Sequence, residues 1–162
     1  MSQETFILSD AVKAKIDHWL KKFPQDQRRS ALIPALHILQ DEQNWLSTPM
    51  MDAVAAYLGV TSMEVYEVAS FYSMFDLEPM GRHKIKLCGS ISCDLCGAHK
   101  IGNHLKQKLG VDYGETTTDG KFTLQEVECL GACRGGPVML LDKVYYEHLT
   151  TKEVDEILDR CE

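Results

Sequence analysis

Long apolar runs, basic stripes and a glycine-rich nucleotide-binding motif are all missing from this chain of 162 residues. No apolar run approaches the roughly 18 residues that a membrane-spanning helix requires. The formal net charge is −7 with the acidic residues scattered, so we do not expect nucleic acid as a partner. The first residues, Met-Ser-Gln-Glu-Thr, lack the apolar segment of a secretory signal peptide. We therefore expect a cytoplasmic protein, in which disulfides are rare.

The chain does contain six cysteines, four of them in two short motifs. Cys88 and Cys93 are separated by four residues, whereas Cys129 and Cys133 are separated by three. Thiolates are soft ligands that suit zinc, Cu(I) and iron–sulfur clusters. Structural zinc sites often mix cysteine with histidine. Two pairs with these spacings favour a wider, two-iron cluster held between two loops. The pattern therefore predicts a [2Fe–2S] cluster, with zinc as the alternative.

Two other interpretations involve Cys96. Cys88, Cys93 and Cys96 fit the C-x4-C-x2-C spacing of a plant-type ferredoxin. Against this, Cys96 stands at the start of a helical run, and the second motif supplies two close cysteines where that site needs one. Cys93 and Cys96 also form a C-x-x-C pair typical of thiol oxidoreductases, which leaves the second motif unexplained. The penultimate Cys161 is interpreted as an incidental thiol.

The first half of the chain, residues 1–75, predicts a small helical bundle. Apolar residues recur at helical spacing, and the Thr61–Glu64 capping box and Gly59 mark a start and a stop. The expected helices lie at about 10–23, 30–45, 48–58 and 62–72. The apolar face of the first consists of Val12, Ile16, Trp19, Leu20 and Phe23. Residues 76–82 contain proline and glycine and are expected to form a linker.

The second half, residues 83–162, predicts a thioredoxin-like α/β domain. Its expected elements are a strand, a helix, a strand, a hairpin and a final helix, at 83–88, 98–109, 122–127, 138–146 and from 150 onward. The whole chain is therefore expected to be an α+β protein. Each cysteine motif follows the end of a strand, which is a common place for a site on an open sheet.

Glycines are frequent beside both cysteine motifs. Backbone N–H groups that point at sulfur stabilise an anionic cluster, and a close approach of backbone favours glycine. Ordinary turns are the alternative explanation of these glycines. Arg134 is interpreted either as a counter-charge for the cluster or as a solvated surface residue. The glycines are Gly89, Gly97, Gly131, Gly135 and Gly136.

Several segments resemble one protein family. Cys88–Cys93, Asp119–Leu124, Glu128–Cys133 and Gly136–Met139 closely resemble the 24 kDa (E) subunit of respiratory complex I, the NADH:quinone oxidoreductase. Val65–Tyr72 is similar to a helical segment of the same family. The similarity extends over about residues 8–160. The additional thiols of the chain are not required by the family motif.

The resemblance implies one [2Fe–2S] cluster on Cys88, Cys93, Cys129 and Cys133, and no catalytic residue on this chain. It also implies a partner, a flavoprotein subunit that carries FMN, the NADH site and a [4Fe–4S] cluster and exchanges single electrons with this chain. The assembly would be a larger respiratory complex, with this chain cytoplasmic and peripheral to the inner membrane. The alternatives are the equivalent subunit of an NAD-linked hydrogenase or formate dehydrogenase, and a zinc-stabilised adaptor.

Three smaller expectations complete the interpretation. Pro137 is a candidate for a cis peptide bond, because thioredoxin-like folds commonly place a cis-proline at a comparable point. Four histidines are interpreted as surface or packing residues, namely His83, His99, His104 and His148. Part of an apolar set near the end of the bundle is expected to dock the partner, and the rest to pack inside. This set consists of Met50, Met51, Tyr57, Phe71, Tyr72, Met74 and Phe75.

Overall fold

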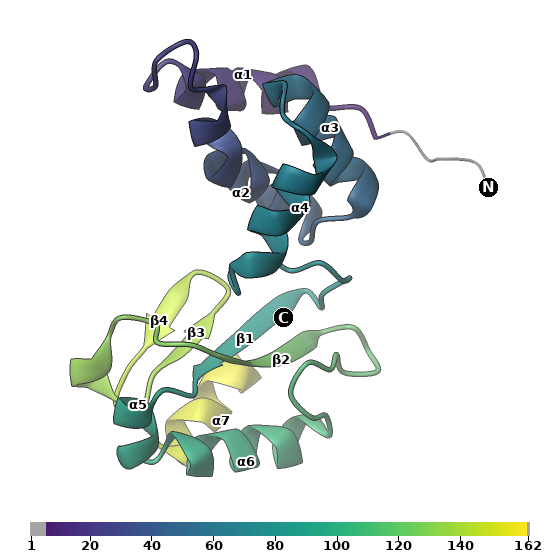
Figure 1. Ribbon diagram of the computed structural model, residues 1–162. Helices are drawn as coiled ribbons and strands as arrows, with labels where there is room; N and C mark the ends of the chain where they lie inside the picture. The colour runs from purple at the N-terminus through teal and green to yellow at the C-terminus, as the bar shows by residue number, and fades with distance from the viewer. Residues whose placement is uncertain (1–5, 162) are drawn as a thin grey trace. The chain divides into compact units, whose positions relative to one another are not determined.

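A computed structural model describes residues 6–161 and divides the chain into two compact units. The first unit ends at Pro79 and the second begins at Met80 (Figure 1). Asp76 still belongs to the first unit, because its carbonyl accepts a hydrogen bond from the Leu46 amide at 2.8 Å. Gly81 belongs to the second, because its amide donates to the Thr123 hydroxyl at 2.6 Å. The connection between the two units is therefore short.

The first unit consists of helices around one apolar core. The helices are α1 (Asp10–Leu20), η1 (Arg28–Ala31), α2 (Leu32–Gln43), α3 (Thr48–Leu58) and α4 (Ser62–Phe71). The largest fully buried side chains are Ile16, Leu36, Leu39, Leu46, Val54, Leu58 and Val65. Gly59 ends α3 in the left-handed region at φ 72°, and Thr61 and Glu64 form a complete capping box on α4. Both signals act as the sequence predicts.

The first two helices are shorter than the apolar pattern indicates. The α1 helix ends at Leu20, well before Pro24, and Trp19 is 37% exposed with the Lys22 ammonium 3.7 Å from the centre of its ring. An ammonium is attracted to the face of an indole ring, so this contact stabilises Trp19 although its ring is not fully buried. Asn44 ends α2 in the left-handed region at φ 69°, where asparagine is tolerated better than most residues. The predicted extension to Trp45 is therefore wrong.

The second unit is a four-stranded sheet with two longer helices on one face (Figure 1). The strands are β1 (His83–Cys88), β2 (Phe122–Val127), β3 (Met139–Leu141) and β4 (Val144–Tyr146), and the helices are α5 (Ile91–Leu95), α6 (Ala98–Leu109) and α7 (Thr151–Asp159). The strand order is β2-β1-β3-β4, with β1 parallel to β2 and antiparallel to β3. Ile85 and Leu87 of β1 are buried with Leu105 of α6 and Val154 of α7 in one core.

Several local predictions for the second unit are confirmed. The strand over 122–127 and the helix over 98–109 have the predicted bounds, and Thr150 with Glu153 forms the capping box of α7. The hairpin turns at Asp142, whose φ is 54°, and the Gly136-Pro137 peptide bond is cis. The short helix α5 was not predicted, because five residues with alternating polarity carry no helical period. Within residues 6–161, no helix is both long and apolar enough to cross a membrane.

Asp155 ties α7 to α6 and makes the stability of this unit pH-dependent. Its carboxylate lies 2.8 Å from Nε2 of His104 and 2.9 Å from Nζ of Lys108. The Lys108 ammonium and the His104 ring hold the pKa of Asp155 below its ordinary value. A depressed carboxyl pKa contributes stability above the unfolded-state value, about 3.9, and that stability is lost as the pH falls through the folded-state pKa.

We therefore expect Asp155→Asn to lower the free energy of unfolding near neutral pH. The difference from the wild type should vanish in strong acid, where the wild-type carboxylate is protonated as well. Chemical unfolding over a series of pH values measures this. Glu156→Gln on the same helix is the matched control, because the Glu156 carboxylate makes a 3.6 Å surface pair with Lys152. An equal difference at every pH would contradict the assignment.

Candidate metal centre

The first cysteine motif spans the end of β1 and the helix α5. Cys88 is the last residue of β1, and Cys93 lies in the middle of α5, and each is 1% exposed. One helical turn places Cys93 inward while Ile91 and Leu95 are 76% and 83% exposed. The two thiols interact with each other through a hydrogen bond. The strand and the short helix thus deliver a buried pair of sulfurs.

The second motif follows β2. Cys129 comes two residues after the strand, and Cys133 begins a 3-10 turn, η2 (Cys133–Gly135). Their Sγ atoms are 3.4 Å apart, and both residues are exposed. Because β1 and β2 are neighbouring parallel strands with Cys88 opposite Val127, the two motifs leave the sheet at the same edge.

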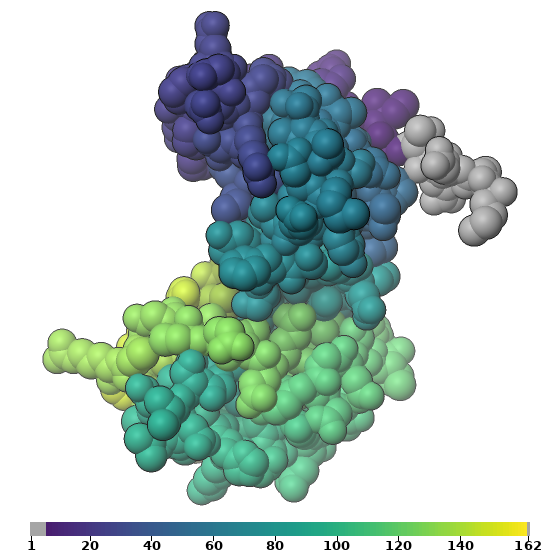
Figure 2. Space-filling model, in the orientation of Figure 1, coloured from purple at the N-terminus to yellow at the C-terminus, as the bar shows by residue number. Residues whose placement is uncertain are grey.

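The two loops touch each other. Leu130 and Ala132, which lie between the exposed cysteines, pack against a small buried cluster formed by Cys88, Cys93, Ala98 and Val138. The backbone N–H of Leu130 also donates a hydrogen bond to the sulfur of Cys88. Figures 1 and 2 show α5 and the turn η2 side by side. One of the two pairs is therefore buried beneath the loop that carries the other.

No disulfide joins any of the six cysteines, all of which the structure describes. Within residues 6–161, no group of three or more His, Cys, Asp and Glu side chains is gathered so that it could hold a single metal ion. The structure shows instead two thiol pairs, Cys88 with Cys93 and Cys129 with Cys133, on loops in contact. Four cysteine thiolates are the ligand set of a [2Fe–2S] cluster, so the type of donor fits that group.

Backbone amides surround the sulfurs. Burial raises the pKa of Cys88, but hydrogen bonds from the amides of Leu130 and Ser90, together with those from the side chains of Cys93 and Ser90, lower it, so that the pKa lies below its ordinary value. Burial and the neighbouring Cys88 raise the pKa of Cys93 to about 11, despite a hydrogen bond from the Val138 amide. Such N–H groups stabilise an anionic cluster as well.

The exposed pair is also held by a backbone amide. The hydrogen bond to Cys129 and the charge of that sulfur raise the pKa of Cys133. The Gly131 amide donates to Sγ of Cys129 at 3.4 Å, and Gly131 itself has a φ of 80°, a conformation that favours glycine. Of the five glycines named from the sequence, Gly131 is the one whose amide is seen to donate to a cysteine sulfur, and further amide donors come from Leu130, Ser90 and Val138.

Cys96 lies beside this site without joining either pair. It ends α5 instead of lying in the first turn of the next helix, as the sequence suggested. Its Sγ is 3.2 Å from where a Cβ on Gly136 would lie, so Gly136 leaves room for it. Cys161 is at the other end of the unit, where its Sγ donates to the Ile157 carbonyl at 3.4 Å.

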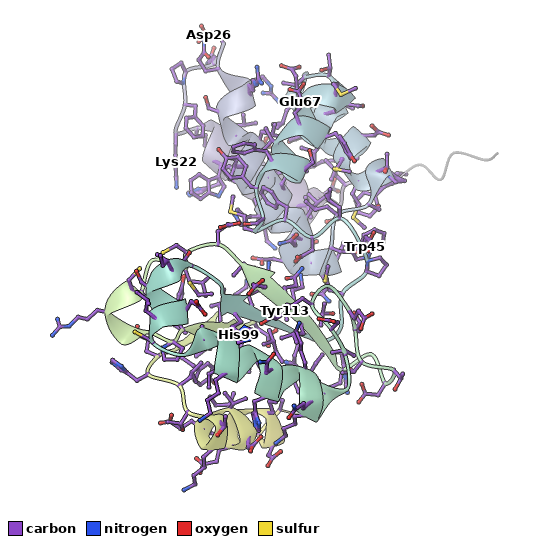
Figure 3. The ribbon with its side chains drawn as sticks, turned by 60° about the horizontal axis from the view of Figure 1, so that its bottom comes forward. Lys22, Asp26, Trp45, Glu67, His99 and Tyr113 are labelled. Atoms are coloured by element: carbon purple, nitrogen blue, oxygen red, sulfur yellow. The ribbon has the colours of Figure 1, made fainter. Side chains whose placement is uncertain are left out.

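The histidines and Arg134, which were named from the sequence, do not form one group around the cysteines. His83 pairs with Asp142 at 2.8 Å, and His104 pairs with Asp155. His99 is exposed in the first turn of α6, and Figure 3 labels it together with Tyr113 of the same unit. Arg134 is exposed within η2.

Comparison with known proteins identifies the class of protein. Residues 16–162 match the model of the thioredoxin-like [2Fe–2S] ferredoxin family, and the chain belongs to this family. Its relatives include subunits of NADH-quinone oxidoreductases. The second E-type subunit of the enzyme from Rhizobium meliloti is 43% identical over 148 residues, which cover 91% of this chain and 87% of that protein.

Two further likenesses differ in what they support. The mitochondrial NADH dehydrogenase [ubiquinone] flavoprotein 2 of Dictyostelium discoideum is 43% identical over 147 residues, or 90% of this chain and 60% of that protein. The crystal structure of an air-oxidized NAD+-reducing [NiFe]-hydrogenase superposes with a TM-score of 0.70 at 21% identity. That match covers 86% of this chain but only 24% of the hydrogenase chain, and it supports the fold alone.

Proposed function

We propose that this chain is an electron-transfer subunit of an NADH-quinone oxidoreductase. It holds one [2Fe–2S] cluster on the thiolates of Cys88, Cys93, Cys129 and Cys133. The observation that carries the proposal is the contact between the two cysteine loops, in which Leu130 and Ala132 of one loop pack against Cys88 and Cys93 of the other. Relatives at 42–43% identity, which are E-type subunits of this enzyme in other organisms, support the same role.

In this role the residues of the chain would bind the cluster and tune its reduction potential, and none of them would act as an acid, a base or a nucleophile. When bound, the cluster supplies one-electron redox chemistry. Cys88 and Cys93, which are buried, and Cys129 and Cys133, which are exposed, would hold the cluster. Amide donors stabilise the additional negative charge that reduction brings.

The proposed partner is a flavoprotein subunit that carries FMN and the NADH site, within a complex peripheral to the inner membrane on the cytoplasmic side. We assign part of the docking surface to the helical unit. Most of the apolar set near its end is packed inside, with Met50, Met51 and Phe75 at 8%, 3% and 6% exposure. Phe71 and Tyr66 of α4, by contrast, are 79% and 50% exposed. Large exposed apolar residues often mark partner surfaces.

Metal and sulfide analysis of anaerobically purified full-length protein tests the proposed cofactor. We expect iron and acid-labile sulfide in equal amounts, about two of each per chain, and a coloured protein. A colourless protein with zinc would support the adaptor interpretation. Thiol–disulfide activity that persists after iron is removed would instead support an oxidoreductase that uses Cys93 and Cys96. Either outcome would overturn the proposed function.

A further inference from the structure

Tyr145 reaches from the hairpin into the second cysteine loop. It lies in β4, and its hydroxyl donates to the carbonyl oxygen of Leu130 at 3.2 Å. The segment just after the hairpin holds the far end of that loop, because the amide of His148 donates to the Gly135 carbonyl at 2.6 Å. The segment between the two contacts includes Cys133. The hairpin and the residues that follow it therefore hold this loop at Leu130 and at Gly135.

The Leu130 carbonyl is part of the peptide group that donates to a cysteine. The peptide between Leu130 and Gly131 has its C=O bonded to the Tyr145 hydroxyl and its N–H donating to Sγ of Cys129 at 3.4 Å. A hydrogen bond accepted by a carbonyl polarises its peptide and strengthens the donor on the other side. Tyr145, Leu130 and Cys129 thus form one chain of hydrogen bonds that ends on sulfur.

We propose that Tyr145 is a positioning residue that raises the reduction potential of the cluster through this peptide group. The inference rests on the proposed function, because it needs a cluster on Cys129. Reduction adds negative charge to the cluster and its thiolates, and N–H donors stabilise that charge. A polarised and firmly oriented Gly131 amide therefore favours the reduced state. Outer partners of metal ligands act in this way in many metal sites.

Tyr145→Phe is the sharpest variant, since it removes only the hydroxyl and keeps the ring. We expect the midpoint potential, measured by EPR-monitored redox titration of the full chain, to become more negative. The expected change is a few-fold in the equilibrium constant of reduction, and a tenfold change would be about 59 mV for one electron. Tyr146→Phe on the same strand is the matched control, because Tyr146 packs against the apolar core of the sheet unit.

A second substitution should shift the midpoint potential in the opposite direction. Replacement of Tyr145 by 3-fluorotyrosine keeps the hydroxyl and makes it a stronger donor, so the potential should become more positive. The deuterium coupling of the exchangeable amide near the cluster, measured by pulsed EPR in D2O, should weaken in Tyr145→Phe and remain in Tyr146→Phe. If the ring of Tyr145 had a purely structural role, both the midpoint potential and the deuterium coupling would be unchanged in Tyr145→Phe.

The outcomes separate this inference from the proposed function. Absence of any [2Fe–2S] signal in the wild type would overturn the proposed function. A normal wild-type cluster with equal potentials in Tyr145→Phe, the fluorinated protein and the control would overturn only the role of Tyr145. Shifts of the same sign in Tyr145→Phe and the fluorinated protein would also contradict it, because the two changes act oppositely on the donor.

Discussion

A Cys133→Ser or Cys129→Ser variant should lose most or all of the visible and EPR signal of the cluster. A hydroxyl is a hard, weakly acidic ligand and replaces a thiolate poorly at iron. These two cysteines are exposed and 3.4 Å apart, so the substitution removes a ligand without opening a cavity in the core. The loss should therefore come from the metal site, with the fold retained. Circular dichroism of the variant, measured beside iron content, checks this.

Cys161→Ser is the matched control for ligand loss. Its thiol only donates to the Ile157 carbonyl, so the cluster spectrum should be unchanged. Cys96→Ser should keep the cluster with at most a shifted potential, because Cys96 lies against Gly136 beside the site. If Cys161→Ser lost as much signal as Cys133→Ser, the assignment of the four ligands would be wrong.

Substitution of the exposed aromatic residues of α4 should weaken the binding of the flavoprotein partner. Phe71 is 79% exposed and stacks edge-on against Tyr72 at 5.0 Å, which leaves a broad apolar surface in water. Aromatic residues at the centre of an interface often contribute about 2 kcal/mol or more to binding. We expect Phe71→Ser together with Tyr66→Ser to raise the Kd for the partner at least about tenfold.

Trp19→Ser provides the comparison for this surface. Trp19 is an aromatic residue of the same unit, on α1, that is 37% exposed and has the Lys22 ammonium over its ring. Co-purification and a binding titration with the flavoprotein should show normal affinity for Trp19→Ser and reduced affinity for the α4 variant. The cluster spectrum should stay normal in both. Equal affinity for all three proteins would place docking elsewhere on the chain.

The fold could be predicted from the sequence wherever one residue type decides a local event. Gly59 stops a helix, Thr61 and Thr150 open helices through capping boxes, and the alternation of polar and apolar residues over 83–87 gives a strand that ends at Cys88. Trp19 was misplaced, because helical spacing alone does not tell whether a ring on the edge of the apolar face is covered. Burial depends on neighbours that are distant in the sequence.

The candidate site, too, could be predicted from the sequence only in part. The cysteine spacing indicated which four thiols to examine, and the structure brings their two loops into contact. The donors could not be predicted, because an amide such as that of Leu130 or Val138 has no side-chain signature. Its direction depends on the conformation of the loop. Tyr145 was missed for a related reason, since its partner is a backbone carbonyl fifteen residues earlier in the chain.

Low-temperature EPR of the anaerobically purified full-length protein, before and after reduction, tests the central claim most directly. An oxidised [2Fe–2S] cluster is EPR-silent, and one-electron reduction should produce a single spin-half signal of about one spin per chain. That signal should disappear in Cys133→Ser and persist in Cys161→Ser. A reduced wild-type protein that shows no signal while zinc fills the site would contradict the account.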